Sequence, residues 1–282
     1  MRHAAGSSKT VLTVLRGGLY GLFDAVFPRC CIGCNEGIEG ERGDLCDDCT
    51  ASLAAAAAVY FCPKCGRSVH RMSVIDGRCR GCRSEATWNT RELVRIGEYT
   101  GLLRASIIRL KHVGDEADAR LLGTRLAAAI ATRPWASELE MLVPVPMHRR
   151  RRWQRPCDHA QVLAQAVAGD LSRRLGRRLA VRSAAVWRKQ YSPSQTYYQT
   201  KNERFENVKD CFETTRRPGV EGKTICIIDN IVVSGATLHE LSKILRKAGA
   251  KRIYAAVAAR SALAGDPRIT ASPVAVDTQS PG

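Results

Sequence analysis

Eight of the twelve cysteines in this 282-residue chain form four C-x-x-C pairs, and this pattern limits the fold of the N-terminal part more than any other feature. A C-x-x-C turn points two thiolates at one ion, and two such turns complete a tetrahedral four-cysteine site for zinc. Gly66 follows the third pair and can take the positive φ of a tight turn. We therefore predict two structural Zn²⁺ ions, whose ligands are Cys31, Cys34, Cys46, Cys49, Cys62, Cys65, Cys79 and Cys82.

Three questions about the cysteines stay open at this point. A disulfide scaffold or redox dithiols would fit the same spacing, although the reducing cytoplasm disfavours disulfides. The spacing also permits sequential pairing or a cross-brace, and sequential pairing is favoured because it closes shorter loops. Cys30 could replace Cys31 in a C-x-x-x-C register. Cys157, Cys211 and Cys226 are isolated and receive no function.

Composition divides the chain into four parts. Apolar residues recur at helical spacing over 8–27, which predicts an amphipathic helix within residues 1–28. The cysteine pairs define a double zinc ribbon at residues 29–86, with an alanine-rich helix between its halves. Helices and strands alternate over 87–264, and the Pro/Ser/Thr-rich residues 265–282 are predicted to form a disordered tail.

The apolar segments are short. None approaches the ~18 residues that predict a membrane span, and the N-terminal apolar stretch is not followed by the small-residue cleavage site of a secretory signal. We therefore expect a cytoplasmic protein without a membrane span.

Residues 87–264 predict an α/β fold, a parallel sheet with helices on both faces, because continuous apolar runs such as 224–228 are typical of central parallel strands. This run would deliver Asp229 at the carboxyl end of a strand, where open α/β sheets hold ligands. A turn of small residues then feeds a helix, whose free N–H groups and dipole suit a phosphate. The turn consists of Val233, Ser234, Gly235, Ala236 and Thr237.

The stretch ICIIDNIVVSGAT, residues 225–237, resembles the diphosphoribosyl-diphosphate signature of type I phosphoribosyltransferases at every position except Asn230. Three further features are the Y-x-G-x-L-R…K segment at 99–111, the PVPMHRRR corner and the P-S-Q…R-x-x-N-V…F segment at 193–212. Together with the cysteine pairs, they make the chain similar to the ComF/GntX family of competence-associated proteins. The resemblance covers about residues 28–260.

This resemblance implies a type I phosphoribosyltransferase fold and a site for phosphoribosyl diphosphate, or a related ribose phosphate, with Mg²⁺. Asp229 and Asn230 would contact the ribose hydroxyls, and the small-residue turn would bind the 5′-phosphate. Lys111 and the arginine run after Pro146 would face the departing pyrophosphate. Without the family pattern, Lys111 fits a solvated helix position equally well.

The chain departs from the family pattern in ways that bear on chemistry. Asn230 replaces the second carboxylate, so it keeps a hydrogen bond but loses the fixed charge that stabilises an oxocarbenium-like transition state. The segment RPCDHAQ, residues 155–161, replaces the R-G-x-N-Q-A of relatives, and Val233 cannot take part in proton transfer. Ligand binding is therefore the firmer expectation, and phosphoribosyl transfer to an acceptor stays open.

Charge supplies a second hypothesis. Lys and Arg number 44 against 27 acidic residues, a net charge of +17, with a dense cluster at 148–155. This excess predicts a polyanionic partner, single-stranded DNA, and the family resemblance adds the DNA-uptake machinery. The alternative is that the basic clusters are solvated helix faces. The residues expected to contact phosphates and a base are Arg149, Arg150, Arg151, Arg152 and Trp153.

Overall fold

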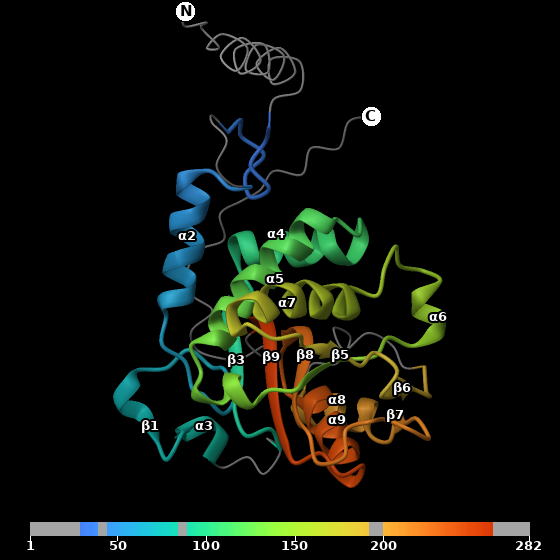
Figure 1. Ribbon diagram of the computed structural model, residues 1–282. Helices are drawn as coiled ribbons and strands as arrows, with labels where there is room; N and C mark the ends of the chain where they lie inside the picture. The colour runs from blue at the N-terminus through green and yellow to red at the C-terminus, as the bar shows by residue number, and fades with distance from the viewer. Residues whose placement is uncertain (1–28, 39–43, 84–88, 192–199, 262–282) are drawn as a thin grey trace, which may run out of the picture. The chain divides into compact units, whose positions relative to one another are not determined.

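The computed structural model describes residues 29–38, 44–83, 89–191 and 200–261 (Figure 1). The amphipathic helix expected at 8–27 and the tail expected at 265–282 lie outside these residues. The chain forms two compact units, which divide between Ala51 and Ser52. Within the described ranges, every helix is too short or too polar to cross a bilayer.

Five parallel strands form the central sheet of the second unit, which confirms the predicted fold class (Figure 1). The chain passes from β4 outward to β5, but from β8 in the opposite direction to β9. The topological switch point therefore lies between β4 and β8. In spatial order the strands are β3 (Leu93–Glu98), β9 (Arg252–Arg260), β8 (Thr224–Val232), β4 (Met141–Pro144) and β5 (Ala180–Val181).

Helices cover both faces of this sheet (Figure 1). Successive strand residues point to opposite faces. Odd-numbered residues such as Ile227 and Ala255 share a core with Leu241. Even-numbered Tyr254 faces the other way, where its ring stacks on Trp135 at 4.0 Å between centroids. The first face carries α9 (Ala236–Lys247), which contacts α8 (Lys201–Val208), and the second carries α4 (Gly101–His112), α5 (Glu116–Ala131) and α7 (His159–Leu175).

Shorter elements complete the described chain. An alanine-rich helix lies between the cysteine pairs, as the composition predicts. An antiparallel hairpin and a helix of four arginines lie near the carboxyl edge of the sheet. The bounds are α2 (Asp47–Ala58), η1 (Arg71–Ser73), β1 (Val74–Ile75), β2 (Arg78–Cys79), α3 (Arg80–Arg83), η2 (Pro134–Glu138), α6 (Arg149–Arg152), β6 (Val186–Arg188) and β7 (Phe212–Thr214).

The third and fourth cysteine pairs pack into the core of the sheet unit. Their four cysteines are buried in the same cluster as Leu93 of β3. The Leu93 N–H donates to the carbonyl of Pro63 at 2.7 Å. Gly66 has φ +73°, and a Cβ added there would lie 2.6 Å from Leu93 Cδ2, so a side chain has no room. Packing thus joins this half of the ribbon to the sheet, across the sequence boundary expected at residue 87.

Strand β8 is longer than the sequence predicted. Its pairing with β9 continues through Asp229 to Val232, whereas its pairing with β4 ends at Ile228. Asp229 therefore lies within the strand, not at its end, but on a stretch that β4 no longer covers. Because successive strand residues point to opposite faces, Asp229 and Asn230 face opposite ways.

Candidate functional site

A cavity of about 250 Å³ opens at the topological switch point. One wall is formed by residues 145–148, which follow β4, and another by residues 231–238, which run from the end of β8 into α9. Asp229 and Lys111 also line it. This is the edge of a parallel sheet at which ligands bind in open α/β folds, as the sequence predicted.

The small-residue turn, residues 233–237, forms the phosphate-loop candidate. Gly235 is the N-cap of α9 and has φ +82°, a left-handed conformation that favours glycine. The Ser234 hydroxyl accepts a hydrogen bond from the Ala236 N–H at 3.3 Å. All five residues of the turn line the cavity. The 12-residue helix α9 therefore begins at the cavity, where its N–H groups and dipole can hold an anion.

Asp229 and Lys111 form an oppositely charged pair at the cavity. Burial raises the pKa of Asp229 to about 6, and the Lys111 charge opposes that rise. Burial lowers the pKa of Lys111, and the Asp229 carboxylate opposes that fall. Each charge thus favours the ionised form of the other. The structure places Lys111 in the cavity wall and not on a solvated helix face.

The cavity carries more positive charge than the sequence predicted. Five cationic side chains are among its described lining residues, and Arg155, Arg188 and Arg204 were not singled out from the sequence. Arg155 donates to the Lys111 carbonyl at 3.1 Å. Arg188 lies over the Phe212 ring at 5.3 Å. Arg204 is the arginine of the R-x-x-N-V motif, so that signal was present, whereas Arg188 reaches the cavity only through the β6–β7 hairpin.

Asn230 lies behind the cavity wall. Its side chain is fully buried, and Nδ2 contacts Nδ1 of His159, the first residue of α7. Within the described chain, its buried Oδ1 has no hydrogen-bond partner. The family resemblance implied that Asn230 would lie beside Asp229 at the ribose. Strand alternation instead directs it to the α7 face, where it contacts His159; His159 lines the cavity, and Asn230 is not among the lining residues.

His159 brings together two of the three departures from the family pattern, Asn230 and the segment 155–161. Burial, with the nearby Lys111 and Arg155 charges, lowers the pKa of His159 to about 3. The ring is therefore neutral at pH 7. A neutral imidazole has one donor and one acceptor nitrogen, so its bond with Asn230 decides which nitrogen carries the proton.

The arginine run of α6 is divided between two environments. Arg151 lines the cavity, and both Arg150 and Arg151 lie over the Tyr191 ring, at 5.0 and 5.9 Å from its centroid. Arg149 and Arg152 are exposed. Trp153 is 91% exposed, which leaves its ring accessible to a base.

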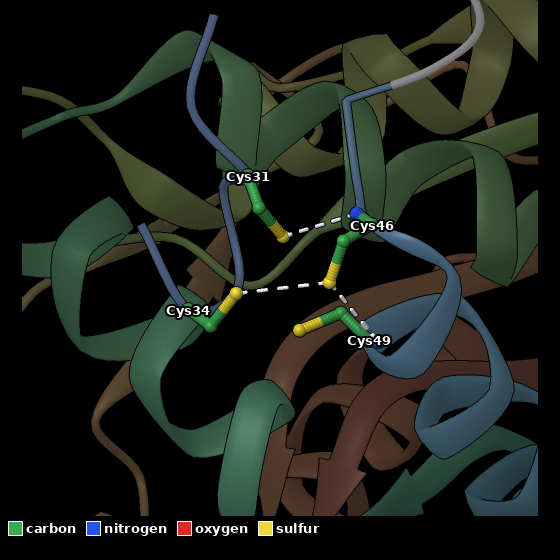
Figure 2. A group of neighbouring side chains, drawn as sticks. All are labelled: Cys31, Cys34, Cys46 and Cys49. Carbon is green, nitrogen blue, oxygen red and sulfur yellow. Dashed lines mark hydrogen bonds between the residues drawn. The ribbon is translucent and has the colours of Figure 1, made fainter. Parts of the chain in front are cut away.

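The first and second cysteine pairs form one cluster. Figure 2 shows the four side chains, whose sulfur atoms all lie within 4.8 Å of one another. The Cys34 and Cys46 sulfurs are 3.7 Å apart, close to the ~3.8 Å edge of a tetrahedron with Zn–S bonds of about 2.3 Å. The Cys46 N–H donates to the Cys31 sulfur at 3.2 Å. Cys31 is buried in the cluster, whereas Cys30 is exposed.

The third and fourth pairs form a second cluster, so the grouping is sequential. All four of its cysteines, Cys62, Cys65, Cys79 and Cys82, are buried. Sulfur separations of 3.6 Å for Cys62–Cys82 and 3.7 Å for Cys65–Cys79 again match a tetrahedral zinc site. The Cys79 N–H donates to the Cys62 sulfur at 3.3 Å, which favours a thiolate. The donor set and spacing of both clusters fit structural zinc.

We expect protein purified under reducing conditions to contain two zinc ions per chain, measured by elemental analysis. Cys82→Ser should leave one zinc and lower the melting temperature, because it removes a buried ligand from the core. Cys30→Ser is the matched control, and it should keep both ions because Cys30 is exposed and outside the cluster. Metal content near zero in a folded chain would contradict the assignment.

Comparison with known proteins defines the class. Residues 22–83 match the double zinc ribbon domain family, and residues 163–280 match the phosphoribosyl transferase domain family. The chain therefore combines a phosphoribosyltransferase-type α/β domain with a double zinc ribbon.

Several curated proteins are similar to the chain over most of its length. The chain is 28% identical over 229 residues to competence protein F of Haemophilus influenzae, covering 79% of this chain and 93% of that one. It is 27% identical to the DNA utilization protein YhgH of Escherichia coli K12, covering 80% and 94%. It is 24% identical to competence protein ComFC of Bacillus subtilis, covering 73% and 79%. The chain is therefore similar to ComF-type proteins over most of its length, which confirms the resemblance that its motifs indicated.

Proposed function

We propose that the cavity binds phosphoribosyl diphosphate or a related ribose 5-phosphate. The observation that supports this function is the convergence of the phosphate-loop candidate, one carboxylate and five cationic side chains on one cavity at the switch point. In this arrangement the turn at 233–237 holds the 5′-phosphate. Asp229 accepts hydrogen bonds from the ribose hydroxyls.

The cations of the cavity suit a diphosphate. Lys111 and Arg151 lie among the lining residues with Arg155, Arg188 and Arg204, and each can donate to phosphate oxygens. Mg²⁺ is commonly bound by one or two carboxylates together with substrate phosphates. Asp229 is the one acidic side chain among the described lining residues, so Mg²⁺ would enter with the diphosphate. Bound there, Mg²⁺ would neutralise charge on the leaving pyrophosphate.

Transfer chemistry requires more of the cavity than ligand binding does. Cleavage at C1′ develops positive charge on the ribose, and the described cavity wall supplies a single carboxylate to stabilise it. We expect firm binding and slow turnover. The test for transfer measures pyrophosphate release from phosphoribosyl diphosphate in the presence of Mg²⁺ and a set of nucleobase and amine acceptors. A release rate equal to the rate without protein would show that the domain binds the ligand without transferring the phosphoribosyl group.

A second candidate function is binding of single-stranded DNA in the cytoplasm, alongside the DNA-uptake machinery. Its support is the net charge of +17, the exposed Arg149 and Arg152, and the 91% exposed Trp153. Relatives named for competence and for DNA utilization point the same way. Exposed arginines would contact phosphates while the indole stacks on a base.

We expect the affinity for single-stranded DNA to fall steeply with salt. Replacing Arg149 and Arg152 together by Ala should flatten the slope of log K against log [salt] by about 1.4, at roughly 0.7 per lost phosphate contact. Replacing Arg120 and Arg125 of α5 by Ala removes the same charge elsewhere and should change the slope little. Fluorescence anisotropy measures both slopes. Equal slopes in the two double variants would show that the α6 arginines are a solvated face without phosphate contacts.

A further inference from the structure

Arg260, the last residue of β9, connects the second cysteine cluster to the phosphate-loop candidate. Its side chain is buried, with 3% of the residue exposed. Nη1 donates to the carbonyl of Cys65, and Nη2 donates to the carbonyl of Val233 at 3.1 Å. Cys65 belongs to the second cluster and Val233 is the first residue of the loop. One planar guanidinium thus spans from a metal cluster to the ligand cavity.

The ribbon end of this connection is held in place by several contacts. A Cβ added at Gly66, the residue after Cys65, would lie 3.6 Å from Arg260 Cδ and 3.7 Å from Arg95 Cδ, so the turn packs on both arginine stems. Arg95 Nη2 donates to the Ser68 hydroxyl at 2.6 Å. Four thiolates around Zn²⁺ would carry a net charge of −2, which the buried Arg260 beside the Cys65 carbonyl can partly offset, whereas Arg95 pairs with Glu98 at 2.8 Å.

The loop end of the connection fixes the direction of a backbone N–H. The Val233 carbonyl and the Ser234 N–H belong to one planar trans peptide, so they point in opposite directions. Because Arg260 holds the carbonyl toward the ribbon, the Ser234 N–H is directed away from the ribbon. The residue before this peptide is also held by the neighbouring chain, since the Ser261 N–H donates to the Val232 carbonyl at 2.9 Å. Binding of an anion at a helix N-terminus depends on the direction of such N–H groups.

We propose that Arg260 is a positioning residue for the phosphate loop, and that the second zinc ribbon is thereby part of the ligand site. Zinc holds Cys65, the Cys65 carbonyl holds Arg260, and Arg260 orients the peptide between Val233 and Ser234. The ligand named in this inference rests on the proposed function, but the order of the loop does not. The proposal concerns the second cluster alone, because the first cluster belongs to the other compact unit.

The direct test measures loop order without ligand. In the zinc-loaded full-length chain, Arg260→Lys should raise amide hydrogen exchange of residues 233–237 by about tenfold or more, because one ammonium cannot hold two carbonyls as the fork does. Arg252→Lys, at the other end of β9, is the matched control; its ion pair with Glu138 lies far along the strand. Loop exchange that is equal in the two variants would overturn the proposal.

Two further experiments, one that changes the metal content and one that measures ligand binding, test the role of Arg260 separately from the proposed function. Cys34→Ser removes a ligand of the first cluster only, so residues 233–237 of this variant should exchange as in the wild type. Full removal of zinc by a chelator should raise the exchange of these residues as Arg260→Lys does. Calorimetry with phosphoribosyl diphosphate should show about tenfold weaker binding in Arg260→Lys than in Arg252→Lys, at equal zinc content. If neither the wild type nor any variant bound phosphoribosyl diphosphate, the proposed function would fail. The exchange data would still decide the role of Arg260. Raised exchange in Cys34→Ser would contradict a role specific to the second ribbon.

Discussion

Replacing Gly235 by Val is expected to abolish binding of phosphoribosyl diphosphate, with an affinity loss of at least about 100-fold, or ~2.7 kcal/mol. Gly235 caps α9 with φ +82°, a conformation that a β-branched residue adopts at high cost. A side chain there would also occupy the space through which the backbone approaches the phosphate. Both effects act on the loop that holds the 5′-phosphate.

The matched control for this change is Gly222→Val. Gly222 also has positive φ, +69°, but a Cβ added there meets no atom within 4 Å. The control therefore imposes the same kind of backbone strain on a turn before β8, away from the cavity lining. Calorimetry on the two variants, with melting temperatures recorded for both, should show binding lost in Gly235→Val and kept in Gly222→Val. Unchanged affinity in Gly235→Val would remove the phosphate-loop assignment.

Restoring a carboxylate at position 230 is expected to raise turnover more when His159 cannot neutralise it. In Asn230→Asp the new carboxylate would contact His159 Nδ1, and its charge would raise the pKa of His159 from about 3 toward the ordinary range. The resulting imidazolium would neutralise the new carboxylate, so no net negative charge would act on the ribose. Combining Asn230→Asp with His159→Gln removes that proton acceptor and supplies an amide donor, so the negative charge persists.

We expect the double variant to release pyrophosphate about tenfold faster than the wild type, or ~1.4 kcal/mol of transition-state stabilisation, with little change in ligand affinity. Asn230→Asp alone should show a smaller gain, and His159→Gln alone should show none. NMR titration of the His159 ring measures the predicted rise in its pKa in Asn230→Asp. A gain in turnover equal in the single and double variants, or a ring that titrates as in the wild type, would contradict this account.

The parts of the site that depend on local sequence were predictable. Each C-x-x-C turn brings its own two sulfurs together, and short loops favour sequential grouping, so both clusters follow from the spacing of the cysteines. The turn from Ser234 into α9 also forms locally, because a glycine at positive φ begins the helix. The apolar run at 224–228 was enough to predict a central parallel strand.

The parts that depend on distant partners were not predictable. Strand β8 extends to Val232 because β9 pairs with it there, and this pairing turns Asn230 away from the cavity. Arg188 reaches the cavity through a hairpin closed across more than twenty residues. Arg260 is an ordinary last residue of an apolar strand until folding places it between Cys65 and Val233. None of these contacts leaves a periodicity or a motif in the sequence.

A calorimetric titration tests most directly whether the cavity at the carboxyl edge of β4 and β8 binds a ribose phosphate. Zinc-loaded full-length protein is titrated with phosphoribosyl diphosphate in the presence of Mg²⁺, and the titration is repeated with Lys111→Ala. We predict saturable binding of one ligand per chain, weakened in the variant because Lys111 lines the cavity. Absence of saturable binding, or binding that Lys111→Ala leaves unchanged, would contradict the account.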